Sequence, residues 1–263
     1  MKKLAGFAIR YLYALVSALY LFTIGIFSSR HRGLIDTIYR HFGYVPPLST
    51  ATTGHVPQVD VREVIDEHAT FQLREPIGVD AGNPSLLEIM IINKLIRSHQ
   101  PSAIFEIGTF TGRTTLNMAA NCAAQSRVYT LDLHPELSDD VSPVPSKTRT
   151  RMGVELVGSK YRGTDCEAKI TQLYGDSATF DFSPYFNSID FIFIDGAHSY
   201  NYVLGDSETA LRLLRNGKGI ILWHNYEEGW GVIKALAELR SRESRLKDVK
   251  HIQGTAMACA ILG

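Results

Sequence analysis

The chain has 263 residues, enough for one α/β domain with an appendage but short for two large domains. Hydrophobic residues make up 45% of the chain and charged residues 21%, with Lys+Arg and Asp+Glu equal at 27 each. These values exclude a disordered or collagen-like chain, and a neutral chain without a basic cluster disfavours a nucleic-acid partner.

The three cysteines, Cys122, Cys166 and Cys259, are odd in number and far apart in the sequence. Neither a disulfide framework nor a CxxC metal site fits this spacing. Cys122 and Cys259 lie in apolar runs and are expected to be buried. A reducing, cytoplasmic location of the main domain follows from this cysteine usage.

The N-terminal segment, residues 1–32, differs in composition from the rest. Its run Tyr11–Ser29 carries no charge, lies between basic residues, and as a helix would be about 28 Å long, close to the thickness of a membrane core. We expect a hydrophobic helix that anchors the chain to a membrane. A helix packed in the protein or against a partner in an oligomer is the alternative, because several tyrosines and serines interrupt the run.

Residues 33–82 are predicted to form a linker and cap. Pro46, Pro47, Gly54 and Pro57 indicate turns. Short helices are expected at Leu34–Phe42 and Val59–His68.

Residues 83–263 alternate between helical and strand-like segments, and this predicts one α/β domain. The expected elements are a helix from Leu86 to before Pro101, strand Ala103–Ile107, helix Thr114–Ala124, strands Arg127–Leu133, Lys169–Tyr174 and Asp190–Ile194, helix Tyr200–Leu214, strand Gly219–Trp223, helix Gly231–Arg240, and two β segments, Val249–Gln253 and Ala256–Ile261. The fold class is a Rossmann-like, seven-stranded, mostly parallel sheet with helices on both faces. A closing hairpin makes the final strand antiparallel.

A glycine-containing turn follows the first strand of this domain, in the sequence EIGTFTGRT from Glu106 to Thr114. Gly108 and Gly112 allow the backbone to turn tightly and approach a ligand, and the next helix points its free N–H groups at that ligand. The G-x-x-x-G spacing, with no lysine after it, disfavours a dinucleotide or nucleoside-triphosphate site.

Acidic residues follow the next two strands. Asp132 ends the strand beginning at Arg127, and a carboxylate there can accept both hydroxyls of a ribose. Asp176 and Ser177 follow the strand Lys169–Tyr174. Asp176 could accept a hydrogen bond from an adenine amine, or Asp176 and Ser177 could simply cap the next turn.

These motifs resemble a known family. Glu106–Thr114 resembles motif I of class I S-adenosylmethionine (SAM)-dependent methyltransferases, and Asp132 matches their ribose-binding acid. The segments 191–200 (FIFIDGAHSY) and 220–226 (IILWHNY) are similar to the FIDGxHxY…WHDY pattern of bacterial small-molecule, sugar and antibiotic O-methyltransferases. The resemblance covers residues 83–263 and implies SAM as cofactor, bound by Glu106, Gly108, Thr109, Gly112, Thr114, Asp132, Asp176 and Ser177.

Three residues after neighbouring strands are candidates for catalysis: Asp195, His198 and His224. Methyl transfer is a direct displacement, so the protein must align the acceptor and take up its proton. Histidine is the side chain most easily poised for that proton transfer near neutral pH, so His198 or His224 is the candidate base.

A divalent metal site is a further expectation from the resemblance. Catechol-type relatives hold a cation at equivalent strand ends, where this chain has Asp195, His224 and Asn225. Asn225 stands where the branch usually has Asp. One carboxylate is a weak set for Mg²⁺, whereas Mn²⁺ or Fe²⁺ would tolerate the histidine, so metal use stays open.

The leading hypothesis is O-methylation of a small-molecule or glycan-type acceptor. A non-catalytic SAM-binding protein at a membrane and a related hydroxylase-like metal enzyme are the alternatives. The long segment His134–Glu167 either covers the substrate or is a solvated loop. If it covers the substrate, its basic residues point to an anionic acceptor.

Overall fold

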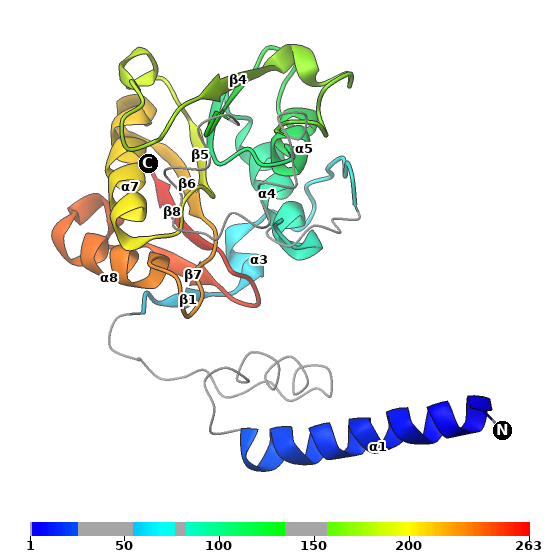
Figure 1. The fold of residues 1–263 in the computed structure, drawn as a ribbon. Helices are drawn as coiled ribbons and strands as arrows, with labels where there is room; N and C mark the ends of the chain where they lie inside the picture. The colour runs from blue at the N-terminus through cyan, green and yellow to red at the C-terminus, as the bar shows by residue number, and fades with distance from the viewer. Residues whose placement is uncertain (1, 26–54, 77–82, 135–156) are drawn as a thin grey trace. The chain divides into compact units, whose positions relative to one another are not determined.

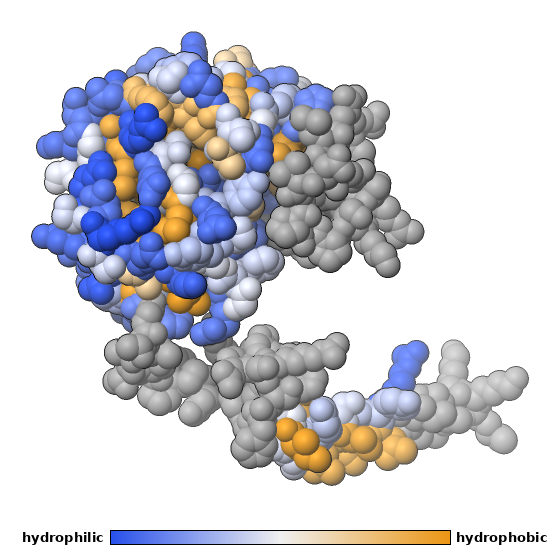
Figure 2. Space-filling model, turned by 60° about the vertical axis from the view of Figure 1, so that its left-hand side comes forward, coloured by the Kyte–Doolittle hydropathy of each residue, from blue (hydrophilic) through white to orange (hydrophobic). Residues whose placement is uncertain are grey.

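The computed structural model describes residues 2–25, 55–76, 83–134 and 157–263. The chain divides into two compact units, Met1–Thr52 and Thr53–Gly263. In the first unit, helix α1 (Lys2–Thr23) exposes apolar side chains along one face, among them Leu12, Leu15 and Leu19 (Figure 2).

Within the described residues, no helix is both long and apolar enough to cross a membrane. The expected membrane span over Tyr11–Ser29 is therefore not supported. The described helix ends at Thr23, so its uncharged part is shorter than the ~20 residues that a span requires. Residues 26–29 and the expected helix at Leu34–Phe42 lie outside the described residues.

The second unit contains an eight-stranded sheet in the order β1-β7-β8-β6-β5-β2-β3-β4 (Figure 1). Its strands are β1 (Gln58–Val59), β2 (Ala103–Ile107), β3 (Arg127–Asp132), β4 (Ile170–Tyr174), β5 (Phe191–Ile194), β6 (Gly219–Trp223), β7 (Lys250–Ile252) and β8 (Ala258–Leu262). Strand β8 is antiparallel to both of its neighbours, β6 and β7, whereas all other pairs are parallel. The predicted fold class is confirmed.

The sheet has one strand more than the seven expected. Strand β1 comes from the region predicted as linker and cap, and it pairs with β7, with Gln58 opposite His251. Two residues are too few to show an alternating pattern, so the sequence carried no signal for this strand. The predicted helix at Val59–His68 is reduced to α3 (Val61–Val64), which begins after the N-cap Asp60.

In the described part of the chain, α4 (Leu86–His99) and α5 (Arg113–Asn121) cover one face of the sheet, and α7 (Tyr200–Leu213) and α8 (Val232–Arg242) cover the other (Figure 1). The side chains of β5, with the sequence FIFI, point alternately to the two faces of the sheet. Phe191 and Phe193 pack in the α4–α5 core, and Ile192 and Ile194 in the α7–α8 core. This two-sided burial explains why the parallel strands are continuous apolar runs. Short 3₁₀ helices lie at Glu167–Lys169, Ser183–Tyr185, Arg215–Gly217 and Ser244–Leu246.

Residues 55–76 belong to the second unit and pack against the rest of it. Val56 is buried, and its N–H donates to the Tyr226 hydroxyl at 2.8 Å. The predicted domain boundaries at 32/33 and 82/83 stay a prediction. All three cysteines are buried and free, as expected of Cys122 and Cys259.

Candidate functional site

The turns after β2 and β5 touch each other. Gly108 has φ +102°, and a Cβ on it would lie 2.1 Å from the Asp195 carbonyl oxygen. Asp195 N–H donates to the Ile107 carbonyl at 2.8 Å, and Gly108 N–H donates to that of Leu131 at the same distance. A side chain at position 108 would force the two turns apart, so glycine is required by close approach as well as by φ.

Asp132 is fixed against the glycine turn. One carboxylate oxygen accepts from Phe110 N–H at 2.7 Å and the other from Leu133 N–H at 2.8 Å. A carboxylate has about four acceptor positions, so these two bonds are compatible with the contact to ribose that the resemblance implies. The structure thus brings Asp132 to the edge where Gly108 and Asp195 lie.

Glu106 and Thr109 belong to a buried network inside the domain. Glu106 Oε2 accepts from the hydroxyls of Thr115 and Thr130, the latter at 2.6 Å, and Thr109 Oγ1 lies 2.6 Å from Thr130 Oγ1. Burial raises the pKa of Glu106 to about 8, although the two hydroxyls act in the opposite direction. Glu106 is therefore mainly neutral at pH 7, and its side chain holds the turn from within.

The network extends to Tyr161, which the sequence analysis did not single out. The Tyr161 hydroxyl donates to Gln172 Oε1 at 2.6 Å, and the Gln172 amide donates to Thr109 Oγ1 at 3.0 Å. The Tyr161 ring packs against Gly112, where a Cβ would lie 2.6 Å from a ring carbon. Tyr161 belongs to the segment His134–Glu167, expected to be a lid or a solvated loop. Its described end is attached to the glycine turn, and residues 135–156 lie outside the described part.

Arg113 is a second residue that the sequence analysis missed. Its guanidinium is buried and donates to the carbonyl oxygens of Glu75 and Pro84 at 2.7 Å each and of Pro76 at 3.3 Å. Arg113 therefore ties the chain on both sides of residues 77–82 to the first turn of α5. The neighbouring Thr114, a predicted cofactor residue, is buried in the same turn.

Asp176 caps a turn and also contacts α7. Its Oδ1 accepts from Ala178 N–H at 2.9 Å, and its Oδ2 accepts from the Tyr202 hydroxyl at 3.0 Å. In the same region, burial raises the pKa of Asp206 to about 7, although a hydrogen bond with Ser177 acts in the opposite direction. Asp176 and Ser177 thus join β4 to α7. The turn-capping role is present, and the adenine contact stays a prediction.

His224 lies between two carboxylates. Its Nδ1 is 3.0 Å from Asp195 Oδ1 and 2.9 Å from Asn225 Oδ1, and its Nε2 is 3.5 Å from Glu88 Oε2. Burial would lower the pKa of His224, but Asp195 and Glu88 outweigh it and raise the pKa to about 10. The ring is therefore an imidazolium at neutral pH, with both nitrogens protonated.

The expected metal site at Asp195, His224 and Asn225 is not supported. These residues do meet, but both ring nitrogens of His224 face oxygens of Asp195, Asn225 and Glu88. Among the described residues, no group of three His, Cys, Asp or Glu side chains could hold a metal ion. The donor set therefore does not fit a divalent cation.

Glu88 completes this cluster and was absent from the sequence analysis. Burial would raise its pKa, but His224 and the N–H groups of Ser85 and Ala256 lower it to about 2. Both N–H groups donate at 2.6 Å, one to each carboxylate oxygen. Ser85 and Glu88 also form a capping box at the start of α4. The S-x-x-E pattern of such a box is visible in the sequence, whereas the contact with His224 is not.

His198 lies beside Trp230. Their ring centroids are 4.9 Å apart with an interplanar angle of 79°, and Gly231 N–H donates to the His198 carbonyl at 2.8 Å. His198 is half-buried, and its neighbours differ from those of His224. His198 packs against an aromatic ring, whereas His224 lies between two carboxylates, so the two candidate bases have different surroundings.

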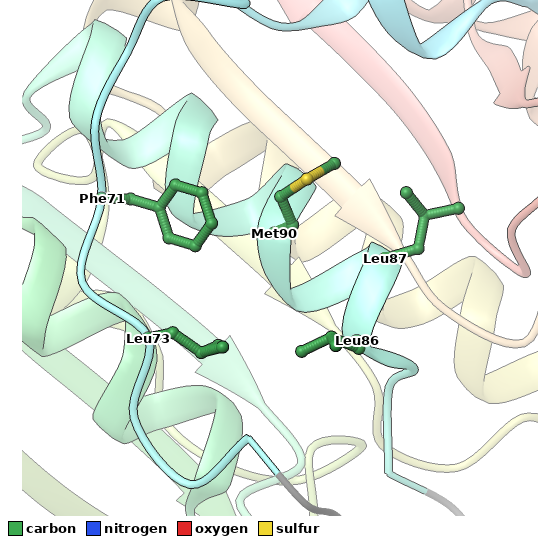
Figure 3. Close-up of a pocket in the computed structure, with 5 residues that line it drawn as sticks. All are labelled: Phe71, Leu73, Leu86, Leu87 and Met90. Atoms are coloured by element: carbon green, nitrogen blue, oxygen red, sulfur yellow. The ribbon is translucent and has the colours of Figure 1, made fainter.

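An apolar pocket of about 340 Å³ lies beside the first turns of α4 (Figure 3). Figure 3 shows side chains of α4 and of the segment before it facing this space, and its lining is Phe71, Leu73, Leu86, Leu87 and Met90. No predicted site residue lines it.

Residues 105–226 match the family of methyltransferase domains. The matched segment extends from the middle of β2 to Tyr226 and so contains the glycine turn, Asp132, Asp195 and His224. It supports the resemblance to methyltransferases at the level of this domain. No curated protein matches the chain significantly.

Several solved structures are similar to the chain at low identity. The O-methyltransferase TomG from Streptomyces achromogenes, involved in tomaymycin synthesis and in complex with SAM, is 16% identical, with 69% of this chain and 82% of that chain covered and a TM-score of 0.49. An O-methyltransferase from Bacillus cereus in complex with SAH is 16% identical, with 70% and 84% covered and a TM-score of 0.48. Values of this size carry no information on the activity of this chain.

Proposed function

We propose that this chain is a SAM-dependent methyltransferase that methylates a hydroxyl oxygen of a small-molecule or glycan-type acceptor. The observation that carries the proposal is the direct contact between the Gly108 turn and the Asp195 turn, with Asp132 fixed beside them. In an open α/β sheet this carboxyl edge is where ligands bind. The match of residues 105–226 to a methyltransferase domain supports the same assignment.

The described residues fit a SAM molecule at this edge. Gly108 lets the turn after β2 lie against the Asp195 turn, and Asp132, fixed at the same edge, supplies a carboxylate for ribose hydroxyls. Asp176 lies after the neighbouring strand β4 and would face the adenine. When bound, SAM supplies an electrophilic methyl group.

The chain itself must take up the proton that the acceptor hydroxyl loses. His224 is protonated at neutral pH and cannot accept it, so His198 is the proposed base. His224 has a positioning role instead: its Nδ1–H orients the Asp195 carboxylate, 3.0 Å away, beside the Gly108 turn. His198 would accept the proton of the acceptor hydroxyl, while bound SAM would supply the methyl group and leave as S-adenosylhomocysteine.

The test is calorimetric titration of SAM into the full chain, compared with Asp132→Ala and with the exposed control Asp248→Ala. We expect micromolar binding by the parent and the control, and at least a tenfold loss in Asp132→Ala, the size expected for one charge-assisted hydrogen-bond pair. A folded parent that does not bind SAM would overturn the proposal.

Turnover assays separate the two alternatives. SAM binding without methyl transfer to any hydroxylated acceptor would indicate the non-catalytic protein. Oxidative turnover that requires added iron would indicate the hydroxylase-like enzyme.

A further inference from the structure

The loops after β5 and β6 hold an aromatic side chain at the edge of the proposed site. A Cβ on Gly231 would lie 2.1 Å from Tyr200 N, and Gly231 N–H donates to the His198 carbonyl at 2.8 Å. The two loops are therefore in backbone contact next to Trp230. The position of Trp230 is set by this contact.

Trp230 is nevertheless exposed. Its exposed fraction is 43%, whereas the other tryptophan, Trp223, is fully buried and donates its indole N–H to Ser207 Oγ at 2.9 Å. Indole burial is strongly favourable, so a tryptophan held at the surface by its own loop is typical of a contact with a ligand. The indole and the His198 ring form a T-shaped contact, with their centroids 4.9 Å apart.

The charged residues in the loop of Trp230 indicate which class of ligand could bind there. The same loop carries Glu227 and Glu228, both exposed, and Glu228 pairs with His55 at 3.4 Å. Carboxylates accept hydrogen bonds from hydroxyls and repel anions. An uncharged sugar ring fits both features, because it can present an apolar C–H face to the indole and hydroxyls to the carboxylates.

We propose that Trp230 is the acceptor-contacting residue of the proposed methyltransferase, and that the acceptor is an uncharged sugar ring that packs on its indole and presents a hydroxyl toward His198. This inference rests on the proposed function. It differs from the anionic acceptor that the basic residues of the segment His134–Glu167 indicate. The two acceptor classes are separated by experiment.

The experiment is a fluorescence titration of the full chain with a panel of methyl glycosides and the corresponding sugar phosphates. Because Trp223 is fully buried, the tryptophan signal that responds to an added sugar is that of Trp230. The variants are Trp230→Phe, Trp230→Ala and the control Ile261→Ala, which removes an exposed apolar side chain from β8. Calorimetry follows the binding of glycosides to both Trp230 variants, which lack the signal.

We expect the parent and the Ile261→Ala variant to bind one or more methyl glycosides, Trp230→Phe to bind them within about threefold, and Trp230→Ala to bind them at least about tenfold more weakly. The SAM affinity of Trp230→Ala should equal that of the parent. Binding of sugar phosphates alone, absence of glycoside binding, or unchanged glycoside affinity in Trp230→Ala would each overturn the inference. A joint loss of SAM and glycoside binding in Trp230→Ala would indicate a structural role and overturn it as well.

Failure of the proposed function has a different signature. A parent that binds glycosides through Trp230 but does not bind SAM would remove the methyltransferase assignment and leave the sugar site.

Discussion

Replacing Glu88 by glutamine tests whether a buried imidazolium stabilises this domain. The substitution keeps the size of the side chain but removes one of the two carboxylates next to His224. It also places an amide NH₂ where Ser85 N–H, Ala256 N–H and His224 need acceptors. The buried imidazolium of His224 then keeps only one of its two carboxylate neighbours. One of the buried groups that donate to Glu88 also loses its acceptor.

The size of the effect follows from the two pKa values. A rise in the pKa of His224 from 6.5 to about 10 corresponds to about 5 kcal/mol for both carboxylates together. A fall in the pKa of Glu88 from 4.5 to about 2 corresponds to about 3 kcal/mol. The contact between Glu88 and His224 contributes to both values, so they are not added. We expect Glu88→Gln to lower the free energy of unfolding by about 2–4 kcal/mol at pH 7.

The pH dependence has a definite sign. A histidine whose folded-state pKa is raised contributes stability that is complete below pH 6.5 and is lost as the pH rises through about 10. Glu88, with a lowered pKa, contributes stability that is complete above pH 4.5 and is lost as the pH falls through about 2. The cluster therefore contributes most between about pH 4.5 and pH 6.5.

Urea unfolding of the parent, Glu88→Gln and the exposed control Glu63→Gln between pH 6 and pH 10 measures both effects. The difference between the parent and Glu88→Gln should narrow as the pH rises, because the parent loses its imidazolium at the higher pH. The control should follow the parent. A difference that stays constant over this range, or a parent whose stability does not fall above pH 7, would refute the imidazolium.

Three further predictions address the rest of the site. Tyr161→Phe removes one hydroxyl from the network behind the glycine turn and should weaken SAM binding about fivefold by calorimetry, whereas Tyr174→Phe, on an exposed side chain, should leave it unchanged. Gly108→Ala should cost more than about 2 kcal/mol in thermal unfolding because its Cβ meets the Asp195 carbonyl, whereas Gly205→Ala, with open space inside α7, should gain about 0.5–1 kcal/mol. His198→Ala should abolish methyl transfer while leaving SAM affinity within twofold in calorimetry; full turnover by this variant would exclude His198 as the base.

The sequence predicts the centre of the sheet well because the signals there are local. Parallel strands covered on both faces are continuous apolar runs, so Ala103–Ile107 and Gly219–Trp223 were located to the residue. The glycine turn and Asp132 follow such strands directly, and the carboxyl ends of parallel strands meet at one edge. Position along the chain was therefore enough to bring these residues together.

Pairings between distant elements had no such signal. Glu88 and His224 are far apart in the sequence, and each has a complete local explanation: Glu88 in a capping box and His224 after a strand. Tyr161 lies in a segment whose pattern fits a lid and a solvated loop equally well. Its role follows only from the Gly112 backbone and the Gln172 side chain that face it.

The residue type of His224 and its position after a strand do not determine its chemical role. An imidazole at a strand end can be a base, a metal ligand or a fixed cation, and the three roles require different partners at its two nitrogens. A base needs a free lone pair, and a ligand needs one directed at a metal. The carboxylates of Asp195 and Glu88 face the two nitrogens of His224 instead, and together they favour a proton on each. This chain has Asn225 where the branch pattern has Asp, so a carboxylate is absent from the same place, and the imidazolium of His224 is the cation that faces Asp195.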